Sequence, residues 1–122
     1  MKLKEIAELL NAEVLVGDEK ALELEITIAC GSDLMSDVLA YTKEKTLLLT
    51  GLTQPQVIRT AEVMDLNAVI FVRGKRPEQV TIQLAKEKNI PLLMTQLPLF
   101  EACGLLYSKG VRGCYDWRNR KD

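Results

Sequence analysis

The chain has 122 residues, of which 48% are hydrophobic and only 5% aromatic, so we expect one domain with an aliphatic core. Sixteen basic residues against 17 acidic ones give a net charge of −1, so we expect no nucleic-acid partner and no anionic membrane partner. The chain has no apolar run of the roughly 18 residues that span a bilayer, and its first residues do not form a secretory signal. We therefore expect a cytoplasmic protein.

The first elements are short. Residues 2–11 carry apolar side chains at helical spacing and predict an amphipathic helix. Residues 12–16 predict a strand, which the Gly17-Asp18 turn signal ends.

The next segment predicts an edge strand and a helix. Residues 24–29 predict a half-exposed strand near the edge of the sheet, because Leu24, Ile26 and Ile28 alternate with polar side chains in a period of two, and this strand could join the sheet. Ser32 or Asp33 can then cap a short helix over residues 34–41.

A unit of apolar strand, polar loop and proline-led helix then occurs three times. The predicted strands cover residues 46–50, 68–72 and 90–94, and the prolines are Pro55, Pro77 and Pro98. Unbroken apolar runs are typical of strands covered on both faces, and successive βα units form right-handed crossovers. The prediction is an α/β fold, a three-layer α/β/α sandwich with a mostly parallel sheet.

The helix that follows Pro77 allows a more detailed prediction. We expect Val80, Leu84 and Ala85 to face the core and Asn89 to form a left-handed cap at the end of the helix.

The end of the chain differs in composition. Gly110 and Gly113 interrupt the periodicity, and the residues around Trp117 are mostly polar. We expect a domain over residues 1–110 and a loosely attached polar tail over residues 111–122.

The carboxyl ends of parallel strands meet at one edge of a sheet, where ligands usually bind at helix amino ends. The candidate ligand-binding residues at this edge are Ser32, Asp33, Thr50, Gly51, Arg73, Gly74, Lys75 and Thr95. The same edge also collects Gly31, Thr53, Arg76 and Gln96. Three nearby cations around a glycine could hold a phosphate or a carboxylate. The alternatives are that these residues are ordinary caps and loop residues, or that the loop contacts a protein.

Several enzyme classes are excluded. The chain has no histidine, no phosphate-binding P-loop and no dinucleotide fingerprint. Cys30, Cys103 and Cys114 lack metal-ligand spacing, so we expect reduced thiols, no metal site and no cofactor. Two further alternatives are a Cys30 thiol whose pKa is lowered near a helix amino end, and a carboxylate pair of Asp33 and Asp37. A buried cysteine and capping or surface aspartates are the simpler interpretations.

The order of these elements resembles a known family. The resemblance rests on residues 31–39 (GSDLMSDVL), 47–51 (LLLTG), 68–77 (AVIFVRGKRP) and 85–95 (AKEKNIPLLMT). They resemble the DRTGG domain, which is similar to the amino-terminal domain of bacterial HPr kinase/phosphatase. The family's central strand usually ends in a Thr-Gly-Gly-like turn, where this chain has Arg73-Gly74.

The resemblance implies an accessory α/β domain without established catalytic residues. In the family it accompanies cystathionine-β-synthase-type (CBS) pairs, phosphotransacetylase-like enzymes or the HPr kinase catalytic domain. Stand-alone versions are similar to small proteins encoded near genes for iron-only hydrogenase maturation and regulation.

The function expected from these observations is regulatory. We expect a non-catalytic module, forming a homodimer, that senses an anionic small molecule or nucleotide or docks on a partner protein. The alternatives are a structural dimerisation subunit, or a small enzyme using Cys30 or the Asp33/Asp37 pair.

Overall fold

The computed structural model describes residues 1–115, which form one five-stranded sheet with helices on both faces. The strands are β1 (Glu13–Val16), β2 (Ala29–Gly31), β3 (Leu47–Thr50), β4 (Ala68–Phe71) and β5 (Leu92–Met94). The helices are α1 (Leu3–Leu9), α2 (Glu19–Leu22), α3 (Met35–Tyr41), α4 (Gln56–Met64), α5 (Gln79–Lys88) and α6 (Leu99–Ser108).

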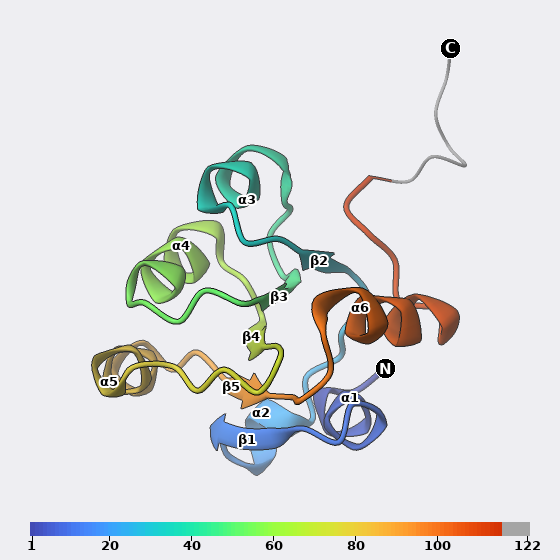
Figure 1. The fold of residues 1–122 in the computed structure, drawn as a ribbon, viewed down its shortest axis with the longest axis horizontal. Coiled ribbons are helices and arrows are strands. Elements are labelled where there is room, and N and C mark those ends of the chain that lie inside the picture. The colour runs from blue at the N-terminus through green and yellow to red at the C-terminus, as the bar shows by residue number, and fades with distance from the viewer. Residues whose placement is uncertain (116–122) are drawn as a thin grey trace.

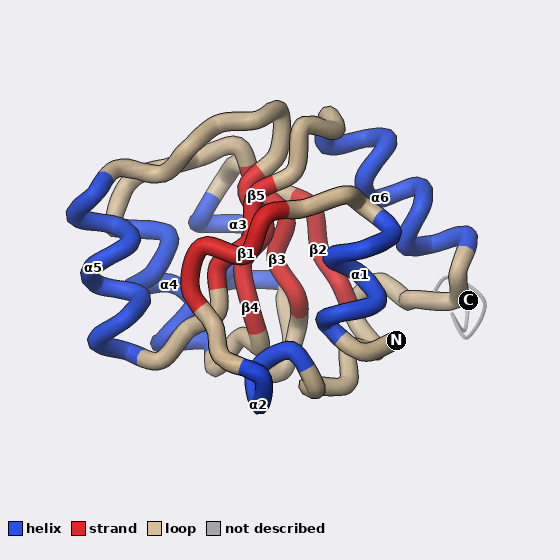
Figure 2. Tube along the Cα trace, turned by 90° about the horizontal axis from the view of Figure 1, so that it is seen from below, coloured by secondary structure: helices blue, strands red, loops and turns tan. Residues whose placement is uncertain are grey.

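The sheet is mostly parallel, as the repeated βα units predict. The strand order is β1-β5-β4-β3-β2; the last four strands of this order run parallel, and β1 pairs antiparallel with β5. Figure 1 shows α3, α4 and α5 on one face of the sheet and α1 and α6 on the other. The short helix α2 lies at one end of the strands (Figure 2). The predicted three-layer α/β/α sandwich is confirmed.

The unbroken apolar runs of the central strands supply two separate cores. Leu48 packs in the cluster beneath α3, α4 and α5, whereas Leu47 and Leu49 pack in the cluster beneath α1 and α6. Successive strand residues point to opposite faces, so a strand covered on both sides needs apolar residues at every position. All three of these leucines are 0% exposed, and burial of a leucine side chain contributes about 1.5–3 kcal/mol.

The segment before β2 is less regular than the alternation predicts. Residues 24–28 form only isolated bridges, Glu25 with Lys2 and Ile28 with Arg112, and the regular edge strand covers Ala29–Gly31 instead. The predicted bounds of this strand were therefore wrong, but a strand at this place does join the sheet as its edge, as predicted. The reason is that residues 24–27 have no neighbouring strand to pair with, only the first residues of the chain and the segment after α6, whereas the Ile28 carbonyl already accepts the N–H of Leu47 in β3 at 2.9 Å.

The amino end of α5 also differs from the prediction. Val80 is 56% exposed, and the buried residues of the helix are Thr81, Ile82 and Ala85. The hydroxyl of Thr81 donates a hydrogen bond to the Thr53 carbonyl at 2.7 Å and turns this face of the helix inward. The left-handed cap at Asn89 is confirmed, with φ 57° and ψ 41°.

The start of the predicted tail is attached to the sheet edge. Val111 is buried, and Arg112 donates its N–H to the Thr27 carbonyl and accepts the N–H of Ala29. The remainder of the tail, with Trp117, lies outside the described residues.

Candidate functional site

The fold brings the carboxyl ends of the four parallel strands together at one edge. In the order β5-β4-β3-β2, their loops place the eight predicted residues in one row along the sheet. We call the row the carboxyl-end rim; it consists of Ser32, Asp33, Thr50, Gly51, Arg73, Gly74, Lys75 and Thr95. The geometry expected from the sequence is present, and the bonds within the rim decide what it can do.

Asp33 links the ends of two neighbouring strands. Its carboxylate accepts a hydrogen bond from the Thr50 hydroxyl at 3.0 Å and another from the Gly51 N–H at 2.6 Å. The first residues of α3 have no side-chain cap, so the prediction that Ser32 or Asp33 caps this helix was wrong. Ser32 does bond locally, since its hydroxyl accepts the N–H of Leu34 at 3.1 Å.

Arg73 and Gly74 form a tight turn after β4. Their φ angles are 59° and 64°, and Lys75 donates its N–H to the Val72 carbonyl at 3.2 Å, as in a turn with two left-handed central residues. Gly74 also lies close to the side-chain amide of Gln96, which would have to move to make room for a Cβ at this position.

Thr95 holds the next loop in place. Its hydroxyl donates to the Leu10 carbonyl at 2.7 Å and accepts the N–H of Leu97 at 3.2 Å, and the residue is 1% exposed. The Thr95 carbonyl in turn accepts the N–H of Gly74 at 2.8 Å, and the Leu97 carbonyl accepts that of Arg73 at 2.9 Å.

These bonds use the backbone donors that an anion would need. The N–H groups of Gly51, Arg73 and Gly74 all have partners within the protein, and the Asp33 carboxylate adds a negative charge to the rim. The exposed side chains of Arg73 and Lys75 form no ion pair within residues 1–115, whereas Arg76 pairs with Glu13 at 3.4 Å. The rim therefore offers two cations but, in these loops, donors that are already satisfied.

The surroundings of Cys30 and of Asp33 differ from those that the two candidate catalytic arrangements require. Burial raises the pKa of the Cys30 thiol, and the neighbouring Cys114 and Cys103 thiols raise it further. The proposed lowering of this pKa was therefore wrong. Burial also raises the pKa of Cys103, whose sulfur lies against the backbone of Gly31. Asp33 is bonded to Thr50 and Gly51 rather than to a partner carboxylate.

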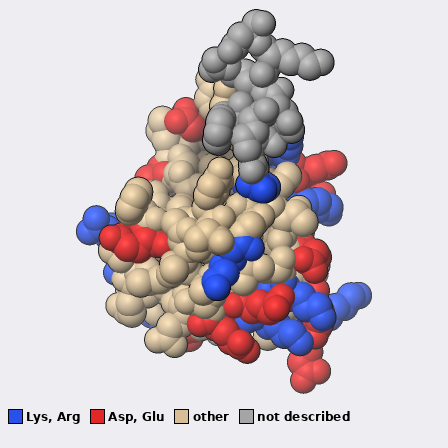
Figure 3. Space-filling view, turned by 90° about the vertical axis from the view of Figure 1, so that its right-hand side faces the viewer, with Lys and Arg blue, Asp and Glu red and all other residues tan. Residues whose placement is uncertain are grey.

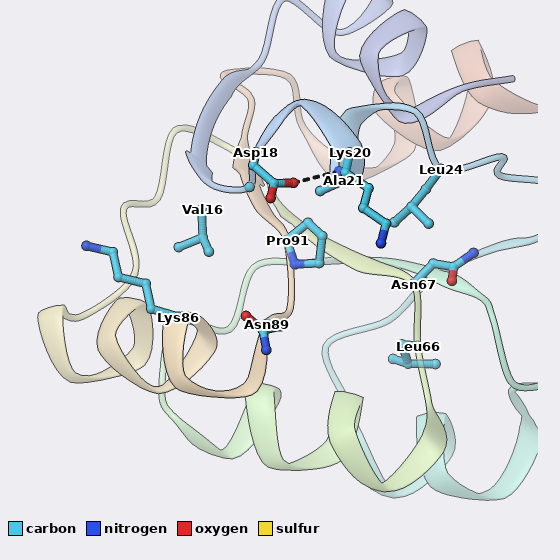
Figure 4. A pocket seen from close by; sticks show the side chains of 11 residues that line it. Val16, Asp18, Lys20, Ala21, Leu24, Leu66, Asn67, Lys86, Asn89 and Pro91 are labelled. Carbon is cyan, nitrogen blue, oxygen red and sulfur yellow. Dashed lines mark hydrogen bonds between the residues drawn. The ribbon is translucent and has the colours of Figure 1, made fainter.

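A cavity of about 550 Å³ lies at the opposite edge of the sheet, where β4 and β5 begin. We call it the amino-end cavity; its floor includes Val16, Leu66 and Pro91, and its polar border includes Lys20, Asn67 and Asn89 (Figure 4). The sequence analysis did not identify these residues, because the single-turn helix α2 that forms one wall was not predicted. The available signal was Asp18, whose carboxylate accepts the N–H of Ala21 at 2.9 Å and starts this helix.

A smaller cavity of about 160 Å³ lies beside β2, between α6 and the segment that follows it. Cys30, Gly31 and Cys103 line it together with Tyr107.

Figure 3 views the molecule from the side of α1 and α6; acidic and basic side chains are mixed there, and uncharged residues cover the middle. That face carries no extended field of one sign.

Residues 1–115 contain neither a cluster of metal-binding side chains nor a helix that could span a membrane. No group of three or more His, Cys, Asp or Glu side chains in this part of the chain is arranged to hold a metal ion. None of the helices described in it is long and apolar enough to cross a membrane.

Comparisons with known proteins agree on the domain. A family model described as "DRTGG domain" matches residues 5–107. Among curated protein sequences, none matches this chain. A similar solved structure contains the CBS and DRTGG domains of the regulatory region of Clostridium perfringens pyrophosphatase, complexed with its activator diadenosine tetraphosphate. The similarity has a TM-score of 0.70 and 19% identity, covers 86% of this chain and 45% of that one, and shows the shared fold.

Proposed function

The chain belongs to the DRTGG domain family, and from this premise we propose that it is a non-catalytic regulatory module that senses an anionic small molecule of the nucleotide class. The observation that carries the proposal is the match over residues 5–107 together with the fold of a regulatory region that binds a nucleotide activator. The chain spans less than half of that region, so the ligand itself is part of the proposal.

The chemistry of the described residues supports a role without catalysis. The pKa values of the Cys30 and Cys103 thiols are raised, which disfavours the thiolate that a nucleophile requires. Asp33, the one carboxylate at the rim, accepts two hydrogen bonds within the protein. Both bonds fall on Oδ1 and fix the orientation of the carboxylate, and no second titratable side chain within residues 1–115 is bonded to it as the partner of an acid–base pair.

Two regions of the molecule are candidates for the position of the ligand. The eight rim residues stay a prediction, supported by the exposed cations Arg73 and Lys75. The amino-end cavity is the second candidate, supported by its volume of about 550 Å³.

Thermal unfolding with a panel of anions tests the proposal. The panel consists of adenosine monophosphate (AMP), diadenosine tetraphosphate, acetyl phosphate and inorganic phosphate. A ligand at about 100 times its Kd stabilises the folded state by about 2.7 kcal/mol, which is easily measured. If no member of the panel raises the midpoint of unfolding, the sensing function is wrong.

The finer parts of the proposal concern assembly and context. We propose that the module is a cytoplasmic homodimer that docks on a partner protein, and that it acts in iron-only hydrogenase maturation or regulation. Light scattering tests the dimer, and the identity of the neighbouring genes tests the hydrogenase link. A monomer at all accessible concentrations would contradict the first part, and unrelated neighbours would contradict the second.

A structural dimerisation subunit is the second candidate function. Phe100 and Tyr107 are 84% and 52% exposed, and they lie seven residues apart on α6 and so share one helix face. An exposed pair of aromatic residues is a typical anchor of a protein interface. This candidate predicts a dimer that Phe100→Glu dissociates and that no small anion affects.

A further inference from the structure

The amino-end cavity has the size and floor of a small-molecule site. Its volume of about 550 Å³ lies within the range of roughly 300–1,000 Å³ that is typical of ligand pockets. Leu66 and Pro91 are buried at its base, and Val16 and Leu24 are half-buried beside them. This floor suits a compact apolar group such as a heterocyclic ring.

The polar groups on the border of the cavity are not engaged with each other. The side-chain amides of Asn67 and Asn89 form no hydrogen bond to another part of residues 1–115, and Lys20 forms no ion pair there. Each amide can both donate and accept, as recognition of a base or a sugar requires. The site thus has an apolar floor with unused donors and acceptors around it.

The charge at the cavity favours an anion of low charge. Lys20 and Lys86 line it against one acidic residue, Asp18, whose carboxylate is bonded to the start of α2. Figure 4 shows Lys20 reaching from α2 into the space beside Pro91 and Asn67, whereas Lys86 points away from Pro91. A single ammonium group directed inward can pair with one phosphate group but not with a polyphosphate chain.

From this geometry we propose that the amino-end cavity, and not the carboxyl-end rim, is the ligand site of the module, and that it takes a nucleoside monophosphate. The ring packs on Val16, Leu66 and Pro91, the amides of Asn67 and Asn89 contact polar groups of the ring or the sugar, and Lys20 pairs with the phosphate. This proposal rests on the proposed function, since it names the ligand class and the position for the same sensing role.

The test compares three probes on the full chain and on matched variants. AMP contains both the ring and the phosphate, adenosine only the ring, and inorganic phosphate only the head group. Calorimetric titration and thermal unfolding are run on the wild type, on Lys20→Glu and on the rim variant Arg73→Ala/Lys75→Ala. Lys109→Glu, which changes an exposed lysine just after α6, is the control for charge alone.

The proposal predicts that AMP raises the midpoint of unfolding of the wild type, by about 5 °C at saturation, and binds more tightly than adenosine or phosphate. Lys20→Glu should lower the affinity for AMP at least about tenfold, which corresponds to loss of about 1.4 kcal/mol. The rim variant and Lys109→Glu should bind as the wild type does. Ala21→Leu, which places a larger side chain on the wall of the cavity, should also block binding.

The contrary results distinguish an error in the position of the ligand site from an error in the sensing function. If the rim variant loses AMP and Lys20→Glu retains it, the cavity assignment is overturned while the sensing function stands. The same holds if the wild type responds to other anions of the panel but not to AMP. If no probe of either experiment affects the wild type, both the assignment and the sensing function are overturned.

Discussion

At the carboxyl-end rim, the Thr95 hydroxyl is buried and bonded to the Leu10 carbonyl. At the amino-end cavity, Asn67 is half-buried and its side-chain amide forms no hydrogen bond within residues 1–115. Both edges carry polar side chains of the kinds that bind ligands. At the rim they hold neighbouring loops together, and at the cavity they border an apolar hollow of about 550 Å³. The comparison shows that the fold determines which polar residues lie near one another, whereas the hydrogen bonds show which of these residues are still free to bind a ligand.

The largest effect should come from removing the buried hydroxyl of the rim. Thr95→Val leaves the carbonyl of Leu10 and the N–H of Leu97 without their partner, and each unsatisfied buried group costs about 1–3 kcal/mol. We expect a loss of about 2–3 kcal/mol in the free energy of unfolding, measured by urea denaturation. Thr53→Val, at a hydroxyl that forms no hydrogen bond within residues 1–115, is the matched control and should change stability by less than about 0.5 kcal/mol. If the two substitutions lower the free energy of unfolding equally, the hydrogen bonds of the Thr95 hydroxyl have no special structural role.

A smaller loss should follow Asp33→Ala. The substitution removes the acceptor shared by the Thr50 hydroxyl and the Gly51 N–H, but the site is partly open to water, so we expect a loss of about 1–2 kcal/mol. Asp37→Ala, which removes an exposed carboxylate from the first turn of α3, should cost about 0.5 kcal/mol. Denaturant unfolding of both variants measures the difference. If Asp33→Ala costs no more than Asp37→Ala, the two hydrogen bonds that Asp33 accepts do not contribute to stability.

At the amino-end cavity, truncation should barely affect stability. Asn67→Ala removes an amide with no partner within residues 1–115, so the free energy of unfolding should change by less than about 0.5 kcal/mol. The same denaturation experiment checks it. A loss above about 1 kcal/mol would mean that the amide is structural, and the contrast between the two edges would then fail.

The smallest effect concerns the pairs that anchor the end of α2. Hydrogen bonds from Lys2 and then Lys4 lower the pKa of the Glu23 carboxyl from its usual 4.5 to about 2. Because the pKa is lower in the folded state, the pairs stabilise the protein above pH 4.5, and this contribution disappears as the pH falls toward 2. The stability difference between wild type and Glu23→Gln should therefore shrink over this range.

Salt provides the control for this pH experiment. The Glu23 pairs are exposed, so added salt should reduce the difference between wild type and Glu23→Gln at neutral pH. A difference that is independent of both pH and salt would show that Glu23 acts through something other than its charge.

The fold was largely predictable because the apolar runs are long and their partners are close in the sequence. The run that contains β4 is apolar at every position, which only a strand covered on both faces tolerates, and its structure is as predicted. The predicted bounds of the strand over residues 24–29 were wrong because a period of two indicates exposure on one side, not the presence of a neighbouring strand to pair with. The prediction that Val80 faces the core was wrong because the hydrogen bond from Thr81 to Thr53 sets the orientation of the start of α5, and no local pattern reveals this bond.

The candidate site was predictable only in its topology. The sequence correctly places Asp33 beside Thr50 and Thr95 beside Gly74, since the loops after parallel strands share an edge. It does not reveal that Asp33 accepts from Thr50 instead of capping α3, because both roles use the same residue type at the same place. The amino-end cavity depends on the four-residue helix α2, which is too short to leave a periodic signal.

The most direct test of the difference between the two edges is a titration of the backbone amides by two-dimensional NMR during addition of AMP. The account predicts that the amide signals of Gly17, Ala21, Asn67 and Asn89 shift together and saturate with one Kd, while those of Gly51, Gly74 and Gln96 stay in place. Shifts confined to Gly51, Gly74 and Gln96 would contradict it and return the ligand to the carboxyl-end rim.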